Sequence, residues 1–284
     1  MTIRPRKRFV WKLKNRELQL GDHTLIVGIL NVTPDSFSDG GEYLDPDRAF
    51  ARALELEEQG AAIIDIGAES TRPGSGRVTE AEEKRRLIPV LKRLRDKLAV
   101  PISVDTYKSG VAANALELGA EIVNDPSGLT LDPQLARVAT NFDAGLILNH
   151  MRGTPDAWAK LPPMKDVMGG VRGDLEAAAH RAVRAGVDRG RIVVDPGLGF
   201  GKRGEQNSEI LARLQELGAL DLPILVGPSR KLFLKQGSPR ETEFATAAAV
   251  TAAILAGAHL VRVHDVLAMR AAVNVADAIL RNAV

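Results

Sequence analysis

The chain has no cysteine, no strong excess of one charge and no long hydrophobic run. Without cysteine there is no disulfide and no thiolate nucleophile, and any metal must bind to oxygen or imidazole ligands. The net charge of +2 gives no overall field that would attract nucleic acid. The longest apolar segment, 245–258, is rich in alanine, is interrupted by threonine and is too short to span a bilayer. We therefore expect neither nucleic acid nor a membrane as a partner.

The rest of the composition is that of an ordinary globular protein. Of its 284 residues, 45% are hydrophobic and 26% are charged, and α/β barrels of this length routinely form one domain. The basic segment Arg4–Arg8 is expected to be a solvated tail. Because no apolar segment follows it, we expect no secretory signal and a cytoplasmic protein.

Short β-branched runs alternate with amphipathic segments along the chain. The expected strands are 25–30, 62–66, 102–105, 121–124, 145–149, 191–195, 223–227 and 259–264. The expected helices are 46–59, 80–98, 109–118, 175–185, 208–217, 244–256 and 266–280. Alternating strands and helices predict a parallel sheet, and eight such units in this length favour the α/β class and a single (β/α)8 TIM barrel.

Local signals agree with these boundaries. Asp45 followed by Pro46 predicts a capped helix start with proline in the first turn, and Gly60 predicts the end of that helix. Thr79 and Glu82 have the spacing of a capping box.

The N-terminal segment has the period of a strand. Apolar and polar residues alternate from 9 to 20, which predicts a short β-hairpin that closes the bottom of the barrel. Since no linker and no second core follow, residues 1–20 are expected to form the basic tail and hairpin, and residues 21–284 the barrel of one domain.

Polar residues stand at the carboxyl end of each expected strand. They are Asn31, Asp65, Asp105, Asn124 with Asp125, Asn149 with His150, Asp195, Ser229 to Lys231, and Arg262 with His264. In such barrels the active site lies at the carboxyl ends of the strands. One aspartate at a strand end is often only a helix cap, but eight polar ends that converge on one mouth cannot all be caps.

Part of this set is suited to a heterocycle. Asp105, Asn124 and Asp195 are expected deep in the mouth, where buried carboxylates and an amide would bind a ligand rich in N–H groups. Since an unpaired buried carboxylate is costly, the ligand is the expected partner, with Lys231 supplying the opposite charge.

Another part is suited to an anion. Arg262 and His264 are two residues apart and project from the same side of a strand, near the place where barrels commonly bind phosphate. Arg72 and the oxygen of Asn31 complete an anion pocket with room for Mg²⁺, which prefers few protein ligands. A heterocycle site beside a diphosphate site suggests group transfer with pyrophosphate as the leaving group.

The glycine-rich segment 195–202 is expected to pack its backbone against a flat ligand, with Phe200 as an apolar wall. A dinucleotide turn is disfavoured because the spacing differs from G-x-G-x-x-G and no acidic residue is placed to bind a ribose. His23, His180 and His259 lie away from strand ends and are expected to be surface or satisfied core residues.

Eight motifs at these strand ends occur in an order known from one family. They are NVTPDSFSDGG, DIGAESTRPGS, SVDTYK, IVNDPSG, HMRGTP, DPGLGFGK, VGPSRK and VRVHDV, and they run from residue 31 to residue 266. In these motifs the chain resembles the dihydropteroate synthases of folate biosynthesis, so the resemblance covers nearly the whole barrel.

The resemblance implies a transferase that condenses 6-hydroxymethyl-7,8-dihydropterin diphosphate with p-aminobenzoate to give 7,8-dihydropteroate and pyrophosphate. It implies Mg²⁺ as the cofactor and a homodimer. By this resemblance, the pterin would be bound by Asp105, Asn124, Asp195 and Lys231. The diphosphate would be bound by Asn31, Thr71, Arg72, Arg262 and His264, with Asn31 also at the metal. The p-aminobenzoate would be bound by Thr71, Pro73, Phe200, Ser229 and Lys231. The implied catalytic set is Asp35, Thr71, Arg72, Lys231, Arg262 and His264, with the loops around Asp35 and Thr71 ordered over the diphosphate.

The implied chemistry suits these residues. If the C–O bond breaks first, nearby carboxylates stabilise the cationic pterin methylene, while Mg²⁺, Arg262 and His264 stabilise the departing pyrophosphate. The arylamine is a neutral nucleophile that needs no strong base, so positioning supplies much of the rate.

The chain departs from the family pattern at four positions. Asn149 replaces an apolar residue that is often methionine, Pro126 replaces valine or isoleucine, Leu198 replaces a common phenylalanine, and Leu232 replaces a frequent serine. These changes concern packing around the pterin. Because the p-aminobenzoate motifs are ordinary, we expect inhibition by sulfonamides.

Two alternatives are weighed against this reading. A methyltetrahydrofolate-binding methyltransferase barrel also binds a pterin, but needs neither the Ser-Thr-Arg-Pro loop nor the set 229–231. A non-catalytic pterin-binding paralogue would be expected to have lost a diphosphate residue, yet Asn31, Arg72, Arg262 and His264 are present. Dependence on Mg²⁺ separates the transferase from both.

Overall fold

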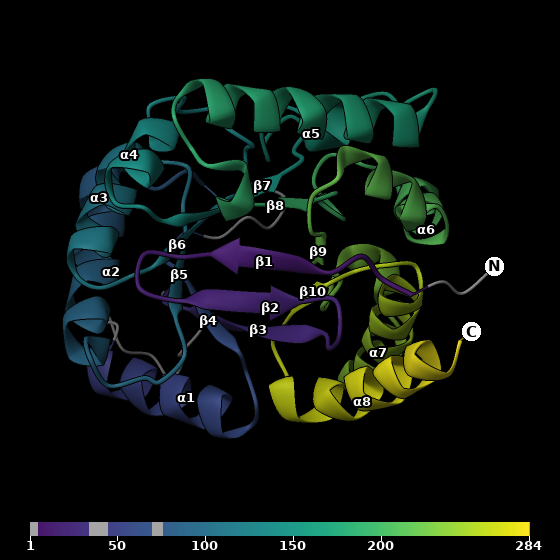
Figure 1. Cartoon of the computed structure of the whole chain (residues 1–284), viewed down its shortest axis with the longest axis horizontal. Coiled ribbons are helices and arrows are strands. Elements are labelled where there is room, and N and C mark those ends of the chain that lie inside the picture. The colour runs from purple at the N-terminus through teal and green to yellow at the C-terminus, as the bar shows by residue number, and fades with distance from the viewer. Residues whose placement is uncertain (1–4, 34–44, 70–75, 284) are drawn as a thin grey trace.

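A barrel of eight parallel strands forms the centre of the computed structural model, which describes residues 5–33, 45–69 and 76–283 (Figure 1). The strands are β3 (Leu25–Asn31), β4 (Ile63–Gly67), β5 (Ile102–Asp105), β6 (Ile122–Asp125), β7 (Gly145–Asn149), β8 (Ile192–Asp195), β9 (Leu225–Val226) and β10 (Leu260–Val263). They are hydrogen-bonded in the order β8-β7-β6-β5-β4-β3-β10-β9. A parallel bridge between Val194 and Ile224 joins the two ends of this order and closes the barrel. The predicted (β/α)8 fold is therefore confirmed.

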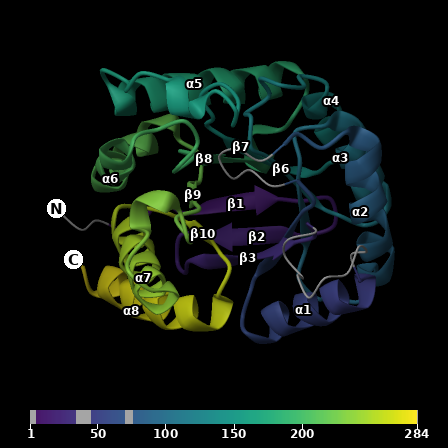
Figure 2. The ribbon, with the colours of Figure 1, turned by 180° about the vertical axis from the view of Figure 1, so that it is seen from behind.

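Helices surround the barrel in Figures 1 and 2. They are α1 (Pro46–Glu58), α2 (Glu80–Leu94), α3 (Ser109–Glu117), α4 (Leu135–Asn141), α5 (Val167–Arg184), α6 (Gly204–Ala212), α7 (Pro239–Leu255) and α8 (Val266–Asn282). Short 3-10 helices span Trp158–Lys160, Arg189–Arg191, Leu214–Leu220 and Leu232–Leu234. Among the described residues, no helix is both long enough and apolar enough to cross a membrane.

Helices α4 and α5 differ most from the sequence prediction, while α6 and α7 begin four and five residues before their predicted starts. Helix α5 begins at Val167, eight residues before the predicted start, because Asp166 caps it by accepting a hydrogen bond from the amide of Gly169 (2.9 Å). The glycines in its first two turns have poor helix propensity and conceal this start in the sequence. The seven-residue α4 was not predicted, since it is too short to show a full helical period.

The predicted helix caps are confirmed in part. The side chain of Asp45 accepts from the amides of Asp47 (2.8 Å) and Arg48 (3.4 Å) at the start of α1. Thr79 caps α2 by accepting from the amide of Glu82. The prediction that the Glu82 carboxylate accepts in return from the amide of Thr79 is wrong, because this carboxylate accepts instead from arginines one turn further along the helix.

Inward-facing residues of the barrel form two layers of opposite character. The lower layer contains Val27, Ile63, Ile122, Ile147, Val193, Leu225 and Leu260, and it is apolar except for Ser103 on β5. Since side chains alternate across a strand, the residues two positions further along form the next inward layer. It contains Ile29, Asp65, Asp105, Asn124, Asn149, Asp195, Gly227 and Arg262. The polar layer faces the carboxyl ends of the strands.

An antiparallel hairpin closes the apolar end of the barrel, as the sequence predicted. Its strands are β1 (Phe9–Lys12) and β2 (Glu17–Leu20), which cross the front of the barrel in Figure 1. Trp11, Leu13 and Leu20 are buried against the lower layer. The indole N–H of Trp11 donates to the carbonyl of Arg191 (2.8 Å), so its one polar atom is satisfied.

The basic N-terminus is only partly a solvated tail. Arg6 is buried, and its guanidinium donates to Asp277 (2.8 Å), to the hydroxyl of Thr24 (2.6 Å) and to the carbonyl of Ala258 (2.8 Å). The expectation of a solvated Arg6 is therefore wrong, because the buried Asp277 on α8 needs a cationic partner. Lys7 and Arg8 are exposed, as predicted.

Candidate active site

The polar layer is organised around the guanidinium of Arg262 on β10. Its Nε donates to Asp65 Oδ2 (2.6 Å) and its Nη2 donates to Asp105 Oδ2 (2.7 Å). Asn124 donates from Nδ2 to the same oxygen of Asp65 (3.1 Å). Four strands thus contribute to one network, and two buried carboxylates share one cation.

This network corrects the predicted division into a heterocycle set and a separate anion set. The partner of Asp105 is Arg262, whereas the sequence assigned that carboxylate to the ligand and to Lys231. Burial raises the pKa of Asp105 to about 7, although the charge of Arg262 opposes the rise. Asp65 was noted as a strand end but not as a site residue. It is completely buried, and its Oδ1 has no hydrogen-bond partner among the residues that the structure describes.

Lys231 faces the same layer from the loop after β9. Its ammonium lies 4.0 Å from the centroid of the Phe200 ring, within the range of a cation–π contact. Burial and the charge of Arg262 lower the pKa of Lys231 to about 8, while Asp195 and Asp105 oppose the shift. The structure therefore brings the predicted Lys231 and Phe200 together at one wall of the site.

A small cavity of about 20 Å³ opens between these groups. It is lined by Asp105, Asn124, Pro126, Asn149, Asp195, Leu198, Phe200, Gly227, Lys231 and Arg262. The walls combine apolar surfaces with convergent polar groups, as the walls of ligand sites do. All four residues assigned to the pterin line the cavity, and so do three of the four departures from the family pattern.

The glycine-rich segment after β8 is built tightly against β7. Gly197 has a φ of +67°, and a Cβ there would lie 1.9 Å from the carbonyl oxygen of His150, so only glycine fits. The Gly197 amide donates to Asp195 Oδ1 (2.7 Å), which fixes the carboxylate. Burial raises the pKa of Asp195 to about 6, against this hydrogen bond.

Lys202 holds this segment in place, a role that the sequence analysis missed. Its buried ammonium donates to the carbonyls of Gly197 (2.7 Å), His150 (3.0 Å) and Phe200 (3.3 Å). Burial lowers the pKa of Lys202 well below its usual value, yet three acceptors match the three donors that only the ammonium form carries. The sequence signal that could have indicated this role is the lysine at the end of the DPGLGFGK motif.

Ser229 and His264 form a pair at the edge of the site. The Ser229 hydroxyl lies 2.9 Å from His264 Nδ1 and accepts from the His264 amide (3.2 Å). Neither residue lines the cavity, and neither does Asn31, which is half-buried at the end of β3. The structure therefore places Ser229 beside a predicted diphosphate residue, whereas the resemblance assigned it to p-aminobenzoate.

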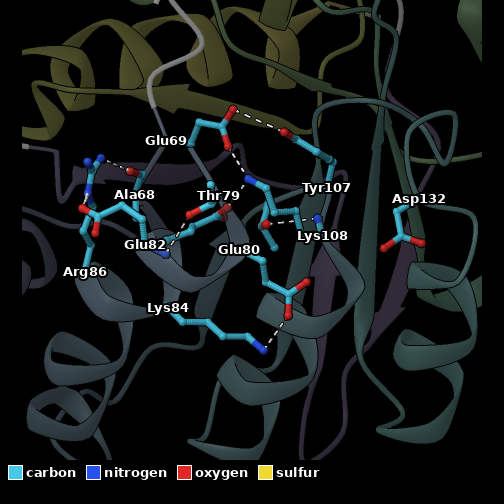
Figure 3. Close-up of polar contacts among 12 residues, drawn as sticks. Ala68, Glu69, Thr79, Glu80, Glu82, Lys84, Arg86, Tyr107, Lys108 and Asp132 are labelled. Carbon is cyan, nitrogen blue, oxygen red and sulfur yellow. Dashed lines mark hydrogen bonds and ion pairs between the residues drawn. The ribbon is translucent and has the colours of Figure 1, made fainter. Parts of the chain in front are cut away.

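A second buried ionic cluster, which the sequence analysis also missed, lies beside the site. Lys108 binds both Glu69 and Glu83, and the hydroxyl of Tyr107 donates to Glu69 (3.4 Å) (Figure 3). Burial raises the pKa of Glu83, although Lys108 opposes the rise. The cluster ties the end of β4 to α2.

Four predicted site residues lie outside the described residues. They are Asp35, Thr71, Arg72 and Pro73. Their roles stay predictions.

The other histidines behave as predicted. His259 is a satisfied core residue, since its Nδ1 accepts from the amide of Ile224 (3.1 Å) and its Nε2 lies 3.0 Å from the carbonyl of Lys7. His23 and His180 are exposed.

Comparison with known proteins connects this geometry to one family. A family model described as pterin binding enzyme matches residues 27–264. The dihydropteroate synthase of Synechocystis sp. is 46% identical over 265 residues, which cover 92% of each chain. The chain belongs to the dihydropteroate synthases. The dihydropteroate synthase of Bacillus subtilis is 43% identical and covers 94% of this chain and 92% of its own.

Solved structures of dihydropteroate synthases share the fold. The Clostridium difficile enzyme in the presence of pteroic acid has a TM-score of 0.87 and 44% identity, with 93% of this chain and 99% of its own covered. The Xanthomonas albilineans enzyme in complex with 7,8-dihydropteroate has a TM-score of 0.85 and 37% identity, with 95% and 98% covered. The Yersinia pestis enzyme, solved with a sulfonamide drug complex, has a TM-score of 0.88 and 36% identity, with 95% and 98% covered.

Proposed function

We propose that this dihydropteroate synthase condenses 6-hydroxymethyl-7,8-dihydropterin diphosphate with p-aminobenzoate, giving 7,8-dihydropteroate and pyrophosphate. The observation that carries the proposal is the cavity in which Asp105, Asn124, Asp195 and Lys231 converge beside Arg262. This set offers acceptors to the N–H groups of a pterin and a cation to its diphosphate.

The pterin binds to the polar layer by its edges. Asp195 is held by the Gly197 amide, and Asn124 is held by Asp65, so both are oriented before the ligand enters. Because these groups are fixed and buried, they need little reorganisation when the ligand binds. Lys231 donates to a ring acceptor from the opposite side of the cavity.

The reaction begins with cleavage of the bond between the pterin methylene and the diphosphate oxygen. The bonding electrons leave with pyrophosphate, and the methylene becomes a cation conjugated with the ring. The carboxylates of Asp105 and Asp195 stabilise this cation from fixed positions. The amine of p-aminobenzoate then forms the new C–N bond and releases one proton to solvent.

The departing diphosphate is bound by cations at the mouth. Arg262 uses Nε and Nη2 within the protein, and in the described part of the chain no group accepts from its Nη1. Nη1 is therefore positioned to donate to the diphosphate. His264, oriented by Ser229, is the second donor, and Thr71 and Arg72 are assigned to the same task. Asp35 is assigned to the loop that covers the diphosphate.

The donor set at the mouth fits Mg²⁺. Asn31 offers one hard neutral oxygen at the end of β3, and the described residues contain no cluster of three His, Asp or Glu side chains able to hold a metal. The ion would therefore take most of its ligands from the diphosphate and water, as Mg²⁺ prefers. When bound, Mg²⁺ would neutralise charge on the departing pyrophosphate.

The p-aminobenzoate site is assigned to the rim of the cavity. Phe200 provides an apolar wall for the aromatic ring, and Lys231 lies over that wall with a positive charge for the carboxylate. Thr71, Pro73 and Ser229 are assigned to the same site. A sulfonamide, which resembles p-aminobenzoate in shape and charge, is expected to inhibit competitively with it.

The deciding experiment measures pyrophosphate release from the purified protein given the pterin diphosphate, with and without p-aminobenzoate and Mg²⁺. We expect release that requires Mg²⁺, and dihydropteroate only when p-aminobenzoate is present. Tight pterin binding without turnover would instead indicate a non-catalytic paralogue. Binding that ignores Mg²⁺, together with methyl transfer from methyltetrahydrofolate, would indicate a methyltransferase.

We further propose a homodimer that forms through helices α7 and α8. Phe244 on α7 is 62% exposed and Val275 on α8 is 60% exposed, and Val275 and Ile279 line a shallow apolar groove. Light scattering should give twice the chain mass for the wild type and the chain mass for Val275→Asp.

Since a charged diphosphate ester does not cross a bilayer unaided, we place the reaction in the cytoplasm.

A further inference from the structure

The carboxamide of Asn149 has no hydrogen-bond partner among the described residues. Asn149 ends β7, is 7% exposed and lines the cavity, where it pairs in register with Asp195. Its Oδ1 is buried without a partner. Leaving a buried polar group unsatisfied destabilises the protein, so this amide requires an explanation.

Neighbouring protein groups cannot supply the missing bond. The oxygen of the amide lies against Gly197, where a Cβ would be 2.5 Å away from it. The Gly197 amide already donates to Asp195, and the carbonyl of His150 already accepts from Lys202. Asn149 also lines the cavity, so a bound molecule is able to supply a partner for its amide.

The amide also differs in chemistry from its neighbours. The carboxylates of Asp105 and Asp195 can only accept hydrogen bonds when ionised, whereas a carboxamide both donates and accepts. A carboxamide can pair twice with a heterocycle edge that carries a donor beside an acceptor, as asparagine does with adenine. A pterin has such edges, because ring N–H groups stand next to a carbonyl or a ring nitrogen.

We propose that Asn149 is a specificity-determining residue that hydrogen-bonds the pterin heterocycle. This inference rests on the proposed function, since it takes the pterin as the occupant of the cavity. Asn149 is destabilising in the unliganded protein and contributes affinity only when the heterocycle is bound. A purely structural asparagine would have the opposite effect on stability.

The test compares Asn149→Leu with the wild type in three measurements. The leucine side chain has the same number and branching of heavy atoms as asparagine, but it is bulkier and cannot hydrogen-bond. Calorimetric titration with pteroic acid should give a Kd about tenfold higher, as expected for one hydrogen bond to a neutral group. Thermal unfolding without ligand should give an equal or higher Tm. The KM for p-aminobenzoate should change less than twofold.

Ser103→Ala is the matched control. Ser103 lies one inward layer below Asp105 on β5, is completely buried, and its hydroxyl has no partner. Removing this hydroxyl should also raise Tm or leave it equal, but it should not change the Kd for pteroic acid. If leucine does not fit against Gly197 and the variant unfolds, Asn149→Ala removes the amide without adding volume and should show the same loss of affinity.

A Kd within twofold of the wild type in the folded variants would overturn the role of Asn149. A lower Tm with unchanged Kd would show that the amide is structural. If the wild type itself neither binds pteroic acid nor turns over the pterin diphosphate, the proposed function fails first, so the two failures are distinguishable.

Discussion

The two inward layers of the barrel are built from the same strands but follow different physical rules. The lower layer, with the hairpin residue Trp11 over it, is apolar except for Ser103, and its stability comes from removing apolar surface from water. The upper layer holds Asp65, Asp105 and Arg262, and it contains buried polar atoms without partners. One layer stabilises the fold, and the other keeps polar groups ready for a ligand at a cost in stability.

The largest effect is expected from breaking the upper layer at its centre with Arg262→Met. Two buried carboxylates would lose their cation, so the free energy of unfolding should fall by about 3–5 kcal/mol. The value of kcat/KM should fall on the order of 10³-fold, because a donor to the departing charge is lost as well. Urea unfolding and steady-state kinetics measure the two effects.

Arg213→Met is the control for that variant. Arg213 binds Glu209 and Glu216 on the surface of the molecule, and exposed ion pairs contribute at most about 1 kcal/mol. Normal activity in Arg262→Met would contradict the role given to this guanidinium.

Breaking the lower layer should separate stability from catalysis. Trp11→Ala removes a fully buried side chain from the barrel floor, and the free energy of unfolding should fall by about 3–5 kcal/mol. At a temperature where the variant is folded, kcat/KM should stay within twofold of the wild type. A large loss of activity in the folded variant would mean that the two layers are coupled.

A smaller effect is expected at Lys202, which holds the glycine-rich segment 195–202 in place beside the site. Lys202→Met leaves the carbonyls of His150, Gly197 and Phe200 without their donor, which should lower the free energy of unfolding by about 2–3 kcal/mol. The KM for the pterin diphosphate should rise because the wall formed by Phe200 is displaced. Lys235→Met, at an exposed lysine of the next loop, should change neither quantity.

A further effect concerns pH. Burial raises the pKa of Asp105 to about 7 and the pKa values of Asp125 and Asp195 to about 6. Between about pH 4 and pH 7 the folded protein therefore binds more protons at these groups than the unfolded chain does. Their contribution to stability is present below pH 4 and is lost as pH rises towards 7.

Denaturant unfolding at pH 5 and pH 7.5 measures the slope, that is, how much the free energy of unfolding falls as pH rises. Asp105→Asn should flatten it, whereas Trp11→Ala should lower stability equally at both values and leave the slope unchanged. Identical slopes in Asp105→Asn and the wild type would show that the carboxyl does not titrate in this range.

Much of the site could be predicted because strands alternate strictly. Asp105 and Asp195 stand at the ends of apolar runs, and the period of two places them on the inner face at one end of the barrel. Helix starts were less predictable where local chemistry was ambiguous. The glycines around Gly169 concealed the first turns of α5, and Arg6 was taken for a tail residue because its partner is 271 residues away.

The sequence alone determined the (β/α)8 barrel, the hairpin under it and the residues that meet at its mouth, since period, turns and strand ends are local properties. Only the tertiary structure decided which of those residues are paired. Arg262 joins carboxylates that lie 197 and 157 residues away in the sequence, and Lys202 binds a carbonyl on another loop. Asn149 is left without a partner for the same reason. Hydrogen bonding of a buried side chain depends on distances across the closed barrel, which no local pattern contains.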